Sequence, residues 1–96
     1  MRPAARLGDS GAVHCSPFVI ATGSPNVFVN GRPAASVGDA SSVHLRPVGK
    51  KCFPHVSFIS SGSARTFVNG KPMAALGDRL TLCTIIASGS PNVFVG

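Results

Sequence analysis

One motif recurs three times in this 96-residue chain and limits what the chain can fold into. Each copy reads as a basic residue, Pro, a run of small or apolar residues, Gly-Asp, four further residues and then His or Cys. The copies are residues 1–14, 31–44 and 70–83. The second copy begins 30 residues after the first, and the third begins 39 residues after the second. A repeat of this kind predicts three copies of one supersecondary unit that stack to bury a shared core.

A second motif lies between the copies of the first and predicts β-hairpins. It occupies residues 23–31, 62–70 and 89–96. In the first of these segments Val27 and Val29 alternate with Phe28, as in a short strand. The pairs Asn30-Gly31 and Asn69-Gly70 favour type I′ turns, which need positive φ at two successive residues. Each return strand then carries the Pro of the first motif and is expected to lie at a sheet edge or to begin just after the Pro, because Pro lacks a backbone donor.

The two ends of the chain carry the two halves of a third hairpin. Residues 88–96 resemble the outgoing strands and residues 1–7 resemble the return strands. We expect the ends to pair and to close the units around an axis, since an open solenoid would need capped ends. The predicted fold class is all-β with pseudo-threefold symmetry. The chain is expected to form one domain, 1–96, with repeats of about 1–30, 31–69 and 70–96.

Composition supports short strands and a need for reinforcement. Gly (11) and Pro (8) are frequent and Glu is absent, which favours strands and turns over helices. A chain this short buries a limited core and often needs a staple. Three cysteines fit a disulfide framework poorly, so together with three histidines they favour a metal. We expect no secretory signal peptide and no membrane span.

Metal-competent side chains occupy the last position of all three copies of the first motif, namely His14, His44 and Cys83. Around a pseudo-threefold axis these positions would converge if they lie near it. The middle unit carries an insertion around residues 46–55, which brings His55 as a fourth candidate. Three imidazoles and one thiolate match a structural zinc site, and four protein ligands leave no open position for catalysis.

Two other cysteines compete for this site. Cys15 directly follows His14, and adjacent strand residues point to opposite faces, so only one of the two can ligate easily. Cys52 lies three residues before His55 and is the stronger rival. Pro54 next to His55 suggests a stiffened loop that presents the His. Iron is the alternative metal, since imidazole suits both.

All three acidic residues, Asp9, Asp39 and Asp78, stand in the Gly-Asp pairs. Asp can accept hydrogen bonds from nearby backbone N–H groups and Gly tolerates unusual φ, so these pairs predict structural turns. A calcium site would need further acidic ligands, which the chain lacks.

The first motif carries a family resemblance. Arg-Pro-Ala-Ala-Arg at 2–6, Arg-Pro-Ala-Ala-Ser at 32–36 and Lys-Pro-Met-Ala-Ala at 71–75, each followed by Gly-Asp, resemble the PAAR-repeat proteins. The resemblance covers essentially the whole chain, although Met73 and Ser36 depart from the motif. It implies a small pointed cone of hairpins with zinc near its apex.

The resemblance also implies a function. Proteins of this family sharpen the trimeric β-helical spike of a type VI secretion system (the VgrG-type protein) or of a related contractile phage tail. They aid membrane piercing and can deliver effector proteins. We therefore expect a structural protein without catalysis, bound as one copy per spike trimer, that is cytoplasmic before assembly and then leaves the cell with the spike. No toxin domain is expected within these residues.

Two other functional classes compete with this interpretation. A zinc-dependent hydrolase would need an exchangeable water on its metal. The formal charge of +6 allows a nucleic-acid-binding module, but the basic residues are spread along the chain. Such modules usually offer stacking platforms. Phe28, Phe67 and Phe94 stand at repeated hairpin positions, and we interpret them as packing residues instead.

Overall fold

The strands of this protein are short and pair as antiparallel hairpins. The computed structural model describes residues 1–12, 17–81 and 84–96, with the backbone alone at 46–48 and 52–53. Its eight strands are β1 (Arg2–Pro3), β2 (Phe28–Val29), β3 (Arg32–Pro33), β4 (His44–Val48), β5 (Lys51–His55), β6 (Phe67–Val68), β7 (Lys71–Pro72) and β8 (Phe94–Val95). They form four two-stranded sheets, and the described part of the chain contains no helix. The predicted all-β fold class is confirmed.

Two of the hairpins turn at the Asn-Gly pairs, as the sequence predicts. Between β2 and β3, Asn30 has φ 54° and Gly31 has φ 78°. Between β6 and β7, Asn69 has φ 51° and Gly70 has φ 81°. Positive φ at both central residues matches the right-handed twist of the flanking strands, which is why the Asn-Gly pair sets the register of each hairpin.

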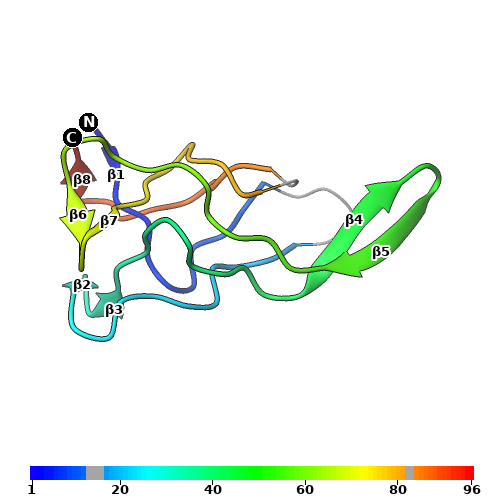
Figure 1. Cartoon of the computed structure of the whole chain (residues 1–96), viewed down its shortest axis with the longest axis horizontal. Helices are drawn as coiled ribbons and strands as arrows, with labels where there is room; N and C mark the ends of the chain where they lie inside the picture. Colours follow the sequence, from blue (N-terminus) through cyan, green and yellow to red (C-terminus); the bar gives the residue numbers. More distant parts are fainter. Residues whose placement is uncertain (13–16, 82–83) are drawn as a thin grey trace.

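The third hairpin is built from the two ends of the chain. Strand β1 pairs antiparallel with β8, with Arg2 opposite Val95 and Pro3 opposite Phe94. Phe28 lies opposite Pro33 in the same way, so the split hairpin keeps the register of the continuous ones. The N- and C-termini lie side by side in Figure 1. The predicted pairing of the chain ends is confirmed.

A closed ring of backbone hydrogen bonds joins the three units through their alanines. The amide of Ala5 donates to the carbonyl of Ala74 (3.0 Å), Ala74 donates to Ala35 (2.9 Å), and Ala35 donates back to Ala5 (3.0 Å). All three residues are fully buried. Only a small side chain fits at so crowded a position, which explains the Ala found two residues after the Pro in each copy of the first motif.

Two apolar clusters flank this ring. One joins the inward-facing valines of the three hairpins to small neighbours: Ala4, Val29, Ala34, Val68, Met73, Ala75 and Val95. The other extends away from the hairpins: Ala5, Phe18, Ile20, Ala35, Ile59, Ala74, Leu80 and Ile86. Both clusters draw residues from all three units, so no unit has a core of its own.

The phenylalanines of the three hairpins do not pack in this core. Phe28 and Phe67 are each 56% exposed and Phe94 is 49% exposed. Their neighbours Val29 and Val68 are buried, and successive strand residues point to opposite faces. The prediction that these phenylalanines are packing residues was therefore wrong, because a two-stranded hairpin at the end of the molecule has only one face against the core.

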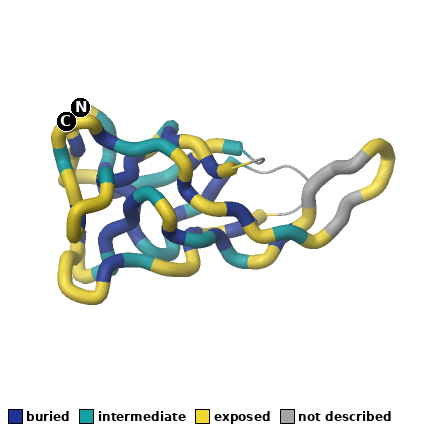
Figure 2. Tube along the Cα trace, viewed as in Figure 1, coloured by how far each residue is buried: buried dark blue, intermediate teal, exposed yellow. Residues whose placement is uncertain are grey.

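The molecule is wide at the end formed by these three hairpins and narrows away from it (Figure 1). Its principal extents are 39 × 23 × 21 Å. Strands β4 and β5 project from the narrow end as one long hairpin. Buried residues lie inside the body, whereas residues 49–51 at the tip of this hairpin are exposed (Figure 2). The three short hairpins form what we call the base.

The projecting hairpin differs from the stiffened loop expected around Pro54, next to His55. Leu45 pairs with Pro54, and Pro47 pairs with Cys52, so both prolines lie within strands. Pro is excluded from the middle of a sheet because it cannot donate to a ladder. A two-stranded ribbon has two open edges, so it accepts Pro wherever no hydrogen bond is required.

The Gly-Asp pairs form the predicted turns. Gly8 (φ 91°), Gly38 (φ 97°) and Gly77 (φ 92°) all adopt positive φ. In each turn the Asp carboxylate accepts a hydrogen bond from the backbone amide three residues earlier. These are Arg6 to Asp9 (2.8 Å), Ser36 to Asp39 (2.8 Å) and Ala75 to Asp78 (2.7 Å). Each buried carboxylate is thereby used to close its turn.

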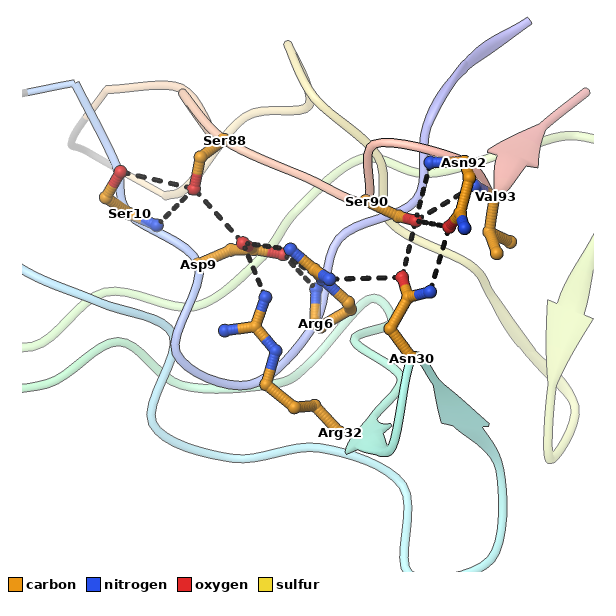
Figure 3. Close-up of polar contacts among 9 residues, drawn as sticks. All are labelled: Arg6, Asp9, Ser10, Asn30, Arg32, Ser88, Ser90, Asn92 and Val93. Carbon is orange, nitrogen blue, oxygen red and sulfur yellow. Dashed lines mark hydrogen bonds and ion pairs between the residues drawn. The ribbon is translucent and has the colours of Figure 1, made fainter.

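The carboxylate of Asp9 links the three units through ion pairs and a hydrogen bond (Figure 3). Asp9 forms a buried ion pair with Arg6, with Nε to Oδ2 at 3.0 Å and Nη2 to Oδ1 at 3.0 Å. Arg32 of the second unit lies 3.4 Å from the same carboxylate. Ser88 of the third unit donates to it at 3.1 Å. Arg6 continues the network to Asn30 at 3.1 Å.

The ion pair with Arg6 predicts that the stability of the fold depends on pH through Asp9. Burial raises the pKa of Asp9, but the hydrogen bonds and charge of Arg6 outweigh it and hold this pKa below its ordinary value of 3.8. A lowered pKa means that the ionised group stabilises the fold above the unfolded value and that this contribution is lost as pH falls through the folded pKa. The wild-type protein should therefore lose stability in acid.

Asp9→Asn should lower the free energy of unfolding at neutral pH by about 3–5 kcal/mol, because it leaves the buried Arg6 uncompensated. It should also flatten the loss of stability in acid. Urea unfolding at pH 7 and at about pH 3 measures both. Asp39→Asn is the matched control, since no cation among the described residues forms an ion pair with Asp39. An equal loss in both variants would show that the turn, and not the ion pair, carries the effect.

Candidate metal centre

The projecting hairpin brings two of the predicted metal ligands together at its open end. His44 begins β4 and His55 ends β5, and the two are cross-strand partners. Their Nε2 atoms lie 2.7 Å apart. The ring centroids are 4.2 Å apart with an interplanar angle of 66°. The insertion therefore returns His55 directly onto His44, where the hairpin joins the body.

The orientation of the His44 ring is set by two neighbours. Its Nδ1 lies 2.9 Å from the carbonyl oxygen of Ser42, an acceptor, so this bond assigns the ring proton to Nδ1. Phe18 stacks on the imidazole at 3.9 Å between centroids and 15° between planes. His44 is 3% exposed. With Nδ1 protonated, Nε2 carries the lone pair that a metal ligand or a hydrogen-bond acceptor needs.

The donor chemistry of this pair fits a zinc ion. Metal-ligating histidines commonly donate their second ring N–H to a carbonyl oxygen, as His44 does to Ser42. Two imidazoles on a tetrahedral zinc, each with Zn–N near 2.0–2.1 Å, would hold their nitrogens about 3.4 Å apart. The Nε2 atoms of His44 and His55, now 2.7 Å apart, would thus separate by about 0.7 Å, a shift within side-chain freedom.

The described residues include only part of the other candidate metal ligands. His14, Cys83 and Cys15 lie outside the described residues. Within residues 1–12, 17–81 and 84–96 no group of three or more His, Cys, Asp or Glu side chains gathers. The backbone of Cys52 lies opposite Pro47, three residues along β5 from His55. At about 3.4 Å per strand residue, that is roughly 10 Å nearer the tip of the hairpin.

The residues that support His44 were not predicted from the sequence. Gly11 stands where the other units carry Ser41 and Leu80. A Cβ atom at Gly11 would lie 1.9 Å from the ring of Phe18. Gly11 thus makes room for Phe18, and Phe18 in turn packs on His44. The signal in the sequence was the loss of side-chain volume at one repeat position beside a nearby Phe, which only the fold connects.

Gly11→Ala should destabilise the protein by about 1–3 kcal/mol, because the added methyl overlaps a buried ring that has no free space. The shift of Phe18 should also disturb His44, and should weaken metal retention if His44 is a ligand. Thermal unfolding and metal content of the purified variant measure the two effects. Gly96→Ala, with nothing within 4 Å of its Cβ, should change neither. Full stability of Gly11→Ala would contradict the packing described above.

The hairpins and the Gly-Asp turns recur once per copy of the first sequence motif, and each copy contributes one alanine to the ring. A comparison of the sequence with models of known protein families identifies this motif. The sequence matches the PAAR motif family over residues 1–43 and 52–96. This chain belongs to the PAAR family. Among curated proteins, none matches it.

The PAAR family is a structural family associated with the spike tips of type VI secretion. The resemblance drawn from the Pro-Ala-Ala segments is therefore confirmed. The match skips residues 44–51, which comprise β4, its turn and the start of β5. The described part of this PAAR protein also contains no helix long and apolar enough to cross a bilayer.

Proposed function

We propose that this protein caps and sharpens the end of a trimeric β-helical spike, in a type VI secretion system or a related contractile tail. The observation that carries the proposal is the base, where three hairpins in one register each expose one Phe at the same position. A partner with true threefold symmetry presents three identical surfaces. One copy of this chain offers three similar ones.

The stoichiometry follows from this count. One chain supplies three hairpins, so a single copy satisfies the three sites at the end of a spike trimer. The end of a β-helix exposes unpaired strand edges that favour being covered. Apolar side chains around such an edge suit a stable contact, because desolvated aromatic residues dominate binding energy at interfaces. The VgrG-type spike protein is the partner we infer in a type VI system.

We further propose that one zinc ion, held by His14, His44, His55 and Cys83, staples the narrow end. The support is the contact between His44 and His55, the orientation of His44, and the equivalent repeat positions of His14 and Cys83. The position of the Cys52 backbone favours His55 as the partner of His44. A closed four-ligand site supplies folding energy and no chemistry, which fits a rigid tip and not a hydrolase.

This role places the protein at the leading end of the machine. It would be assembled onto the spike in the cytoplasm and delivered with it, in contact with a target membrane only during injection. Effector proteins could travel with the same tip.

Two experiments test these proposals. The full chain should co-elute with a purified trimeric β-helical spike in size-exclusion chromatography, and failure to form a complex with any spike encoded beside it would overturn the capping role. Elemental analysis of the purified protein should find about one zinc per chain. If a different metal is found in that amount, the bound ion is iron or another metal and not zinc. If no metal is found, the proposed metal site is wrong.

A further inference from the structure

The two Asn-Gly turns of the base carry one reactive pair in nearly the same sequence. They read Val-Asn-Gly-Arg-Pro at 29–33 and Val-Asn-Gly-Lys-Pro at 68–72. The Asn and the Gly of each pair are exposed. Because Gly has no side chain, it leaves the carbonyl carbon of the preceding Asn side chain open to attack by its own backbone nitrogen. The intrinsic reactivity of the two sites is therefore similar, and a difference between them comes from the fold.

The reaction at such a pair is deamidation. The backbone nitrogen of Gly attacks Cγ of Asn, a new N–Cγ bond closes a succinimide ring, and the Cγ–Nδ2 bond breaks. Nδ2 leaves as ammonia with the proton that the Gly nitrogen gives up. Water then opens the ring. Opening at Cγ yields aspartate, and opening at the backbone carbonyl yields isoaspartate, in which the main chain runs through the former side chain. Water is the only co-reactant.

The backbones of the two turns are alike. Asn30 and Asn69 have φ 54° and 51°, and the glycines that follow have φ 78° and 81°. Among the described residues, neither Gly31 nor Gly70 donates a hydrogen bond from its amide. The attacking nitrogen is thus free at both sites. The step that the fold can control is the departure of the Asn side chain from its native position, because ring closure must bring Cγ onto the Gly nitrogen.

The side-chain amide of Asn30 is held at both of its ends (Figure 3). Its Oδ1 accepts hydrogen bonds from Nη1 of Arg6 at 3.1 Å and from Oγ of Ser90 at 2.6 Å. Its Nδ2 donates to Oδ1 of Asn92 at 2.8 Å. Arg6 is itself fixed by its buried ion pair with Asp9. A hydrogen bond from a charged donor is stronger than one between neutral groups, so Asn30 is difficult to rotate.

The side-chain amide of Asn69 is held at one end only. Its Nδ2 donates to Oγ of Ser24 at 3.0 Å and to Oδ1 of Asn26 at 2.9 Å. No donor among residues 1–12, 17–81 and 84–96 makes a hydrogen bond to its Oδ1. Both partners of Asn69 are neutral. Its side chain therefore leaves the native position more readily than that of Asn30.

We propose that Asn69 is a site of spontaneous deamidation in the folded protein, and that the hydrogen bonds of Arg6 and Ser90 protect Asn30 from the same reaction. The product has an oxygen where Asn69 carries Nδ2, so it no longer donates to Ser24 and Asn26. Isoaspartate also lengthens the backbone within a turn whose length sets the register of β6 and β7. The modification therefore alters one corner of the base.

Peptide mass spectrometry of protein aged in warm, mildly alkaline buffer tests the proposal. Trypsin does not cleave before Pro, so Asn69 falls in peptide 66–79 and Asn30 in peptide 7–50. In the folded protein Asn69 should react at least about tenfold faster than Asn30, since one further hydrogen bond and a charged donor restrain Asn30. In urea the two sites should react at similar rates. Equal rates in the folded protein, or no reaction of Asn69 there, would overturn the proposal.

Two reciprocal variants test whether the hydrogen bonds set the rates. Asn92→Ala removes the acceptor of Asn30 Nδ2 and should speed the reaction of Asn30 about fivefold, with Asn69 unchanged. Asn26→Ala removes an acceptor of Asn69 Nδ2 and should speed the reaction of Asn69 by a similar factor, with Asn30 unchanged. If neither variant changed the rate at its own site, hydrogen bonding would not be the cause of the difference.

An effect on docking rests on the proposed capping function, whereas the modification does not. Ion exchange separates the modified chain, which carries one more negative charge, from the unmodified chain. The modified fraction should bind the trimeric spike more weakly. Equal binding of the two fractions would show that this corner of the base does not contribute to docking. If neither fraction bound the spike, the capping role would be wrong while the deamidation measured by mass would stand.

Discussion

Replacing Cys83 with Ala should remove the metal and much of the fold together. Structural zinc contributes about 10–16 kcal/mol in small zinc-dependent domains, which equals or exceeds the whole stability of most domains. A net loss of only about 4 kcal/mol would lower the Tm of a chain this size by roughly 15–30 °C. The measurement is metal content and thermal unfolding on the same preparation, with chelator-treated wild type for comparison.

Three further variants assign the ligands. Cys15→Ala should keep both metal and Tm, because Cys15 is not in the proposed set. His55→Ala should lose metal and Cys52→Ser should keep it. The reverse outcome for these two would make Cys52 the fourth ligand. If Cys83→Ala kept its full metal content and its Tm, the proposed site would be wrong.

Substituting the three base phenylalanines should greatly weaken spike binding and leave the fold intact. Aromatic residues buried at the centre of an interface typically cost about 2 kcal/mol or more each when truncated. The triple variant F28S/F67S/F94S should therefore bind the spike at least 10³-fold more weakly. Because the three side chains are half exposed in the free protein, its Tm should fall by only a few degrees.

Phe58→Ser is the control for this experiment. Phe58 is 51% exposed, like the base phenylalanines, but it lies outside the three short hairpins, bridged to Ala40. The Phe58→Ser variant should bind the spike as the wild type does. Titration by surface plasmon resonance or calorimetry measures all of these variants. Unchanged affinity in the triple variant would show that the base phenylalanines do not form the docking surface.

The fold was predictable where local chemistry and repetition agree. Asn30-Gly31 and Asn69-Gly70 specify their turns by backbone conformation alone, so the register of two hairpins follows from the sequence. The split hairpin follows from matching the chain ends to those copies. The Gly-Asp turns were predictable for the same reason, because each Asp bonds an amide only three residues away.

Features that depend on long-range packing were not predictable in this way. Alternation identified Phe28 and Val29 as strand neighbours on opposite faces but could not say that one face meets solvent. Pro54 suggested a stiffened loop and not a strand, because the sequence does not show that the hairpin has two open edges. The support of His44 by Phe18 and Gly11 depends on contacts between segments that only the fold brings together, although Gly11 does stand out in the repeat alignment.

The candidate site was predictable in part. Repeat alignment and the insertion pointed to His44 and His55, and the structure brings these two rings into contact. The contributions of His14 and Cys83 remain predictions from their equivalent repeat positions. Equivalence in a repeat is a strong guide near an axis, because symmetry brings all copies to one place.

Native mass spectrometry of the purified complex with a trimeric β-helical spike tests the central claim most directly. The three similar hairpins of one chain predict a mass of one spike trimer plus one copy of this protein. Three copies per trimer would mean that each spike chain binds its own molecule and that the pseudo-threefold base is not the docking surface, which would contradict the account.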